Sequence, residues 1–67
     1  MKILNDQNKV IGKVEQDRVN GKPKPFNYRY IGLNNITFPI SANDEAMACY
    51  KACKFFGAGY SYLLFTI

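Results

Sequence analysis

The apolar and polar residues of this chain follow a strand-like pattern up to about position 40 and a helical pattern after it. The segments at about 9–19, 22–33 and 35–40 are rich in β-branched and aromatic residues, and Asn20-Gly21 and Asn34-Asn35 separate them. Asn-Gly is typical of a type I′ hairpin turn, because both residues tolerate positive φ. The pattern therefore predicts a three-stranded antiparallel sheet built from two consecutive hairpins.

A single helix is predicted at about 42–56. Ser41 is placed to cap its N-terminus and Gly57 to end it. The positions that recur at the spacing of one helix face are Ala46, Cys49, Tyr50 and Cys53. After the helix, residues 60–67 are expected to form an extended segment or an extra strand. Together these elements predict an α+β fold in a single small domain, residues 1–67.

Two prolines bear on how the first two strands pair. With a two-residue loop at Asn20-Gly21, Pro23 and Pro25 both fall in non-hydrogen-bonded pairs, where no N–H is needed. Irregular backbone from Gln16 to Pro25 is the alternative. The regular register predicts a helix-facing side made of Val10, Gly12, Val14, Ile31, Leu33, Ile36, Phe38 and Ile40. The outer side then holds Ile11, Lys13, Glu15, Asp17, Lys22, Lys24, Phe26, Tyr28, Tyr30 and Thr37.

Composition favours a folded and small protein. A chain of 67 residues buries only about 60% of its unfolded surface, yet 48% of the residues are hydrophobic, with five Tyr and five Phe. No apolar run is long enough to span a membrane, and the first residues do not follow the pattern of a signal peptide. We therefore expect a cytoplasmic protein with no membrane association.

No motif typical of an enzyme is visible in this chain. It contains no His, which excludes Ser–His and Cys–His pairs, and its glycines do not form a phosphate-binding loop. A disulfide between Cys49 and Cys53 on one helix would be strained, and two cysteines are too few to hold a metal ion. We expect free thiols packed against the sheet, and no enzymatic activity, cofactor or metal site.

Positive charge is concentrated in the first half of the chain. The net charge is +4; residues 1–30 hold seven Lys or Arg against three Asp or Glu, whereas residues 31–67 hold two of each kind. A localised excess of this kind favours a polyanionic partner, and a solvated basic surface is the alternative.

One predicted surface combines aromatic rings with lysines, and it is the candidate binding site. Its members are Lys13, Lys22, Lys24, Phe26, Tyr28 and Tyr30. Rings can stack on bases while lysines neutralise phosphates, so the surface predicts nucleic-acid binding. The same residues also fit a protein-binding surface or ordinary cross-strand pairs.

The alternative function is that of a small inhibitor or adaptor, of the kind that phages and mobile elements encode, which binds and modulates a larger host protein. The short chain and the apolar C-terminal segment motivate this alternative. The same segment offers a possible homodimer contact.

The second half of the chain resembles AP2-type DNA-binding domains and the related arm-site domains of tyrosine-recombinase integrases. The likeness lies in Phe38, the segment 44–53 (DEAMACYKAC), Gly57 and Phe65. It implies a three-stranded sheet packed on one helix and DNA binding through the sheet. Those families read DNA with arginines and tryptophans on their first two strands, whereas this chain has no Trp and offers Lys9 and Lys13 on the first. No DNA-reading residue is therefore carried over.

Overall fold

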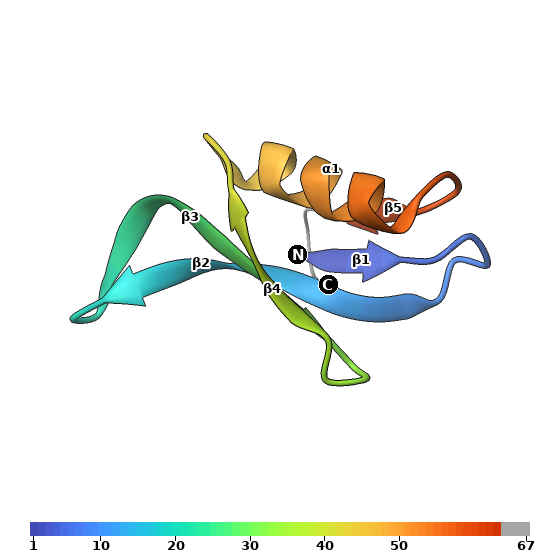
Figure 1. Cartoon of the computed structure of the whole chain (residues 1–67), viewed down its shortest axis with the longest axis horizontal. Coiled ribbons are helices and arrows are strands. Elements are labelled where there is room, and N and C mark those ends of the chain that lie inside the picture. Colours follow the sequence, from blue (N-terminus) through green and yellow to red (C-terminus); the bar gives the residue numbers. More distant parts are fainter. Residues whose placement is uncertain (64–67) are drawn as a thin grey trace.

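The computed structural model describes residues 1–63 as five strands and one helix (Figure 1). The elements are β1 (Lys2–Leu4), β2 (Val10–Val19), β3 (Lys22–Gly32), β4 (Thr37–Ser41), α1 (Glu45–Phe56) and β5 (Ser61–Leu63). Neighbouring strands are antiparallel, in the order β4-β3-β2-β1-β5. The predicted α+β class is confirmed, but the sheet has five strands and not three. Two three-residue strands, too short to show an alternating pattern, extend the sheet beyond β2.

The two predicted hairpin turns are present. Asn20 and Gly21 have φ angles of 54° and 79°, as a type I′ turn requires. Asn35 closes the second turn with a φ of 68°, and the Gly32 N–H donates to the Ile36 carbonyl at 2.7 Å. The predicted extended segment after the helix is a strand over 61–63, which pairs with β1, and its remaining four residues lie outside the described part of the chain.

The helix ends where the sequence predicts but begins later. Asp44, and not Ser41, caps the N-terminus of α1, because its Oδ1 accepts a hydrogen bond from the Met47 N–H at 2.8 Å. Ser41 is the last residue of β4 instead. At the other end, Gly57 adopts a φ of 119°, and its N–H donates to the Cys53 carbonyl.

The pairing of β2 with β3 changes register within the hairpin. Next to the turn, Arg18 lies opposite Pro23 as predicted, whereas Gln16 lies opposite Tyr28. One residue of β2 between these pairs therefore faces the four residues 24–27 of β3, three more than regular pairing would place there. Because side chains alternate along a strand, an odd shift exchanges the two faces of β3.

The exchanged faces overturn the predicted outer surface. Tyr28 and Tyr30 are 5% and 1% exposed and lie in the core beneath α1, not on the outer face. Ile31, predicted to face the helix, lies opposite Lys13 on the outer face. Three further residues predicted to face the helix remain largely exposed: Val10, Leu33 and Ile36. The predictions for Gly12 and Val14 agree with the structure, since neither residue lies beyond the shift. Phe38 and Ile40 also face the helix as predicted, because they lie opposite Tyr30 and Tyr28, which the shift turns toward the helix.

The core forms where small helix residues meet a cluster of aromatic rings. Small side chains of α1 face the sheet: Ala48, Cys49, Ala52 and Cys53. The Tyr30 ring stacks on Phe38 with centroids 4.9 Å apart and meets the edge of Phe56 at 5.1 Å. Its hydroxyl donates to the Ile11 carbonyl at 3.2 Å, so the buried polar atom is satisfied.

Gly12 allows close approach, as predicted, but the group that approaches is the Tyr30 ring. A Cβ atom at Gly12 would lie 2.6 Å from the Tyr30 hydroxyl oxygen and 2.6 Å from the Ile31 carbonyl oxygen. The ring therefore covers the space that a side chain on β2 would occupy. This contact favours the shifted register, because the regular register would place Tyr30 on the other face.

The β4 edge of the sheet is protected against pairing with another strand. Pro39, in the middle of β4, has no N–H to offer to a further strand. At the end of the strand, the Lys51 side chain donates to the Ser41 carbonyl at 2.6 Å and occupies that acceptor.

We expect Gly12→Ala to lower the free energy of unfolding by about 1–3 kcal/mol, because a methyl group must displace the Tyr30 ring or the backbone of β3. Urea unfolding measures the change. The exposed neighbour Lys13→Ala is the control and should shift stability by less than about 0.5 kcal/mol. Equal midpoints for the two variants would contradict the packing described here.

Candidate functional site

The β2–β3 hairpin continues beyond the rest of the sheet as a two-stranded arm, which we define as residues 16–26 (Figure 1). On one side, the pairing of β1 with β2 reaches only Lys13, with one further bond from the Val14 N–H to the Met1 carbonyl. On the other side, the pairing of β4 with β3 reaches only Asn27. Among the described residues, no third strand therefore pairs with the arm.

The arm carries three exposed cations and several exposed apolar groups. The cations are Arg18, Lys22 and Lys24, and none of them forms a salt bridge within residues 1–63. The one acidic residue of the arm, Asp17, is engaged by Arg29 at 3.5 Å. Arg18 also donates to the Gly21 carbonyl at 3.2 Å, which ties its side chain to the turn. The arm is therefore a narrow, positively charged projection.

Phe26 stands at the base of the arm in an unusual conformation. Its φ is 64°, and its side chain is 58% exposed. A bulky residue in this left-handed region costs roughly 1–2 kcal/mol, and an exposed ring gains little burial to offset it. Two hydrogen bonds hold the backbone here: the Ala42 N–H donates to the Phe26 carbonyl at 3.2 Å, and the Asn27 amide donates to the Pro25 carbonyl at 2.7 Å.

A second basic feature lies on the outer face of the sheet. One row of side chains crosses all five strands and consists of Leu63, Lys2, Lys13, Ile31 and Thr37. Lys2 and Lys13 are direct neighbours, and like charges in such a pair repel. The Lys13 ammonium group forms a salt bridge with Glu15 at 2.9 Å. The hydrogen bond from Lys13, together with the positive charge of Lys13, lowers the pKa of the Glu15 carboxyl. Lys2 forms no such salt bridge within residues 1–63.

The structure separates the six predicted site residues into three groups. Lys22, Lys24 and Phe26 lie together on the arm, and Lys13 lies apart on the outer row. Tyr28 and Tyr30 are buried, which raises the pKa of both hydroxyls and removes both rings from any binding surface.

Sequence reasoning missed two cations of these surfaces. Arg18 belongs to the arm, and its position two residues before the Asn20-Gly21 turn was a usable signal. Lys2 joins the outer row through β1, a strand too short to be predicted with its register.

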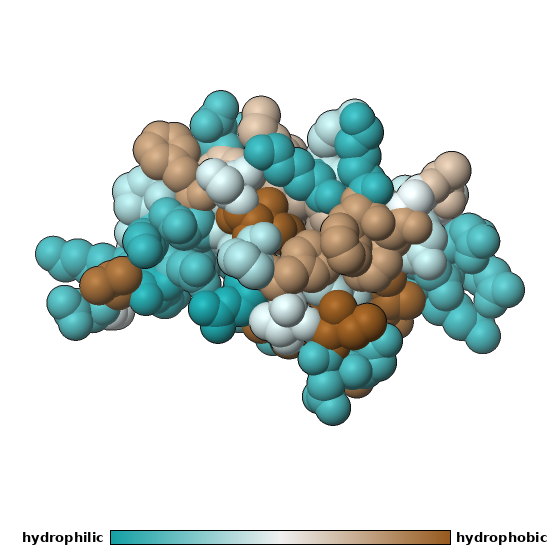
Figure 2. All heavy atoms as spheres, in the orientation of Figure 1, coloured by the Kyte–Doolittle hydropathy of each residue, from teal (hydrophilic) through white to brown (hydrophobic). Residues whose placement is uncertain are grey.

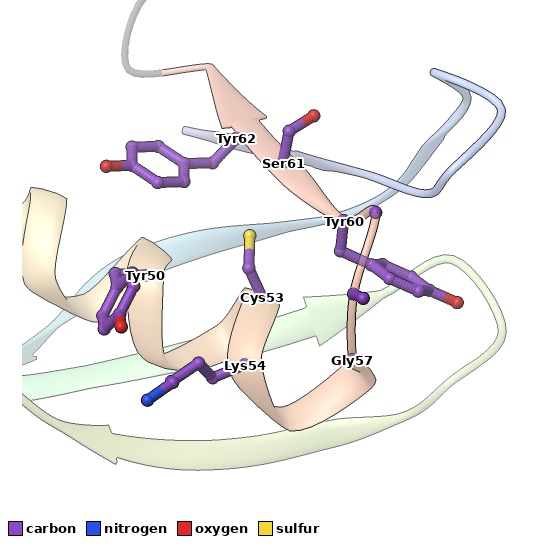
Figure 3. A pocket seen from close by; sticks show the side chains of 9 residues that line it. Tyr50, Cys53, Lys54, Gly57, Tyr60, Ser61 and Tyr62 are labelled. Atoms are coloured by element: carbon purple, nitrogen blue, oxygen red, sulfur yellow. The ribbon is translucent and has the colours of Figure 1, made fainter.

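A groove of about 540 Å³ lies between the C-terminal half of α1 and β5 (Figure 3). Tyr50, Tyr60 and Tyr62 surround it, with the Cys53 side chain directed into it from α1. The Lys54 ammonium lies 5.3 Å from the centre of the Tyr50 ring. Three of the nine lining residues are tyrosines, and none of the nine carries a carboxylate that could act as a general base.

Both cysteines are buried free thiols, as the helix pattern predicts. Burial raises the pKa of Cys49 to about 11 and also raises the pKa of Cys53. The Cys49 sulfur lies 3.7 Å from the sulfur of Met1. A thiol that keeps its proton in this way is a poor nucleophile. Within residues 1–63, no three His, Cys, Asp or Glu side chains are grouped as metal ligands.

An apolar patch covers the C-terminal half of α1 and the neighbouring β3–β4 turn (Figure 2). Phe55 is 67% exposed, with its ring centroid 4.5 Å from that of Phe38. Leu33 and Ile36, in and beside the turn, are also exposed.

Comparison with protein-family models, curated proteins and solved structures found no match for this chain. No helix in the described part of the chain is long and apolar enough to cross a membrane.

The buried Cys49 thiol predicts a loss of stability in alkaline solution. Above pH 9 the unfolded chain releases this proton at its ordinary pKa of 9.0, whereas the folded chain keeps it up to about pH 11. The free energy of unfolding should therefore fall across this interval. Urea unfolding from pH 8 to 11 measures it. Cys49→Ala should make the fall less steep, and the remainder comes from Cys53, Tyr28 and Tyr30, whose pKa values are also raised by burial. The same slope in both proteins would show that this thiol is not protected.

Proposed function

We propose that this chain is a small non-enzymatic module that binds nucleic acid through the arm, supported by the lysines of the outer row. The observation that carries the proposal is the exposure of Arg18, Lys22 and Lys24 on a projecting hairpin whose one acid is already paired. Such a hairpin brings several cations close to a phosphate chain with little other surface in the way.

The chemistry of the arm suits phosphate neutralisation more than base reading. Lysine ammonium groups are compact charges on flexible stems, and they release counterions when they contact phosphates. The one arginine of the arm already donates to the Gly21 carbonyl, so fewer of its donors are free for base edges. We therefore propose binding with weak sequence preference.

The outer row strengthens the proposal. The repulsion between Lys2 and Lys13 slightly lowers the stability of the free protein, and a bound polyanion would relieve this repulsion. Together with the arm, these residues account for most of the positive charge in the first half of the chain.

The test is a salt titration of binding to a labelled nucleic acid pool. Lys22→Ala with Lys24→Ala should weaken binding and reduce the slope of log K against log salt concentration by about 1.5–2, because two phosphate contacts are lost. The matched control is Lys9→Ala with Lys54→Ala, which removes the same charge away from the arm. Fluorescence anisotropy measures all three proteins. Equal losses in both double variants would reduce the effect to net charge and contradict the role of the arm.

A gain of affinity provides an independent check. Glu15→Gln removes the carboxylate that engages Lys13 at 2.9 Å, so binding of the same pool should tighten by about twofold to fivefold. Asp6→Asn makes the same charge change in the β1–β2 turn and is the control. The interpretation of the outer row fails if the control gains as much as Glu15→Gln.

The apolar patch favours a second candidate function, that of an adaptor or inhibitor bound to a larger protein. The observation that supports this second function is the 67% exposure of Phe55 together with the exposed Leu33 and Ile36. A pull-down from lysate with and without nuclease separates the two functions. A partner that resists nuclease and is lost with Phe55→Ser supports the adaptor, whereas a partner lost with nuclease supports the arm.

A further inference from the structure

The conformation of Phe26 points to the form of the nucleic acid. The register shift accounts for the irregular backbone here, but it does not require a bulky ring that combines a strained φ of 64° with 58% exposure. We propose, building on the proposed function, that the ligand is single-stranded nucleic acid and that the Phe26 ring stacks on one unpaired base. Lys22 and Lys24, on the same strand, would contact the flanking phosphates.

The backbone around Phe26 is fixed before any ligand arrives. Pro25 restricts the residue before it, and the Pro25 carbonyl accepts a hydrogen bond from the side-chain amide of Asn27 at 2.7 Å. On the arm side, the Gln16 amide donates to the Lys24 carbonyl at 3.2 Å across the register shift. On the sheet side, the Ala42 N–H bonds the Phe26 carbonyl. A ring on such a fixed backbone loses little freedom when a base stacks on it.

The number of exposed rings decides between single strands and duplexes. Stacking of one base on an aromatic side chain is worth about fivefold to 150-fold in affinity. Insertion of a ring into a duplex must first separate a stacked base step, at a cost of similar or larger size. The arm offers one ring, since Tyr28 and Tyr30 are buried, and only a narrow surface for a bent duplex to wrap. A single strand has bases already free to stack, so it is the favoured ligand.

Binding to labelled oligomers of about 12 nucleotides tests the proposal. The probes are oligo-dT, oligo-U and a duplex hairpin with the same number of phosphates, all at one salt concentration. We expect both single strands to bind at least about tenfold more tightly than the duplex. A preference for one single strand over the other distinguishes a DNA ligand from an RNA ligand.

Substitutions at Phe26 separate stacking from charge. Phe26→Ala should weaken oligo-dT binding by about fivefold to 100-fold and leave the salt slope unchanged, because no phosphate contact is lost. Phe26→Trp should retain binding. Phe26→Leu keeps apolar bulk without an aromatic face and should behave like the Ala variant.

Phe26→Gly excludes unfolding as the cause. Glycine adopts the positive φ without strain, so this variant should melt at the same or a higher temperature while its oligo-dT binding falls as in Phe26→Ala. A large fall in melting temperature would overturn the view that the ring serves binding and not folding.

The two proposals fail in different ways. Equal affinity for duplex and single strands, or full binding by Phe26→Leu, would overturn the stacking proposal. The arm would then still bind nucleic acid if Lys22→Ala with Lys24→Ala lowered the salt slope. Absence of binding to every probe at low salt would overturn both proposals.

Discussion

The contact between the Tyr30 ring and Gly12 is the constraint on which the rest of the structure depends. The ring fills the space that a β2 side chain would take, stacks on Phe38 and reaches the Ile11 carbonyl with its hydroxyl. All three contacts require Tyr30 on the helix side of the sheet. That placement in turn requires an odd shift in the pairing before Tyr28, and the hairpin provides it with three extra residues within 24–27.

The irregular stretch at 24–27 connects the packing of the core to the conformation of the proposed binding surface. Phe26 lies inside the irregular stretch, where its positive φ and outward ring are consequences of the shift. Beyond it the hairpin leaves the sheet and presents its three cations where no other strand of residues 1–63 pairs with it. Burial of two tyrosines thus stabilises the conformation that exposes one phenylalanine and the basic arm.

The sequence predicts the order of the elements well and the faces of β3 poorly. The Asn20-Gly21 turn, the end of the helix at Gly57 and the β2 side of the core follow from local chemistry that the structure retains. The regular register also explained Pro23 and Pro25, so nothing local required a shift. The competing advantage was long-range: Gly12 leaves room for a ring that lies 18 positions later in the chain. The hydrophobic periodicity of either strand alone does not show a contact between residues so far apart in the chain.

The candidate site was predicted only where it did not depend on register. Lys22, Lys24 and Phe26 are exposed as predicted, whereas Tyr28 and Tyr30 are buried in the core and not on the surface. An amide-resolved NMR titration of the protein with a single-stranded oligomer tests most directly whether the arm binds nucleic acid. If the arm and the outer row bind the strand, the largest shifts fall in residues 16–26 and around Lys2 and Lys13, with little change beside Tyr50 and Tyr62. Shifts centred on the α1–β5 groove or the Phe55 patch, with the arm unchanged, would contradict binding through the arm.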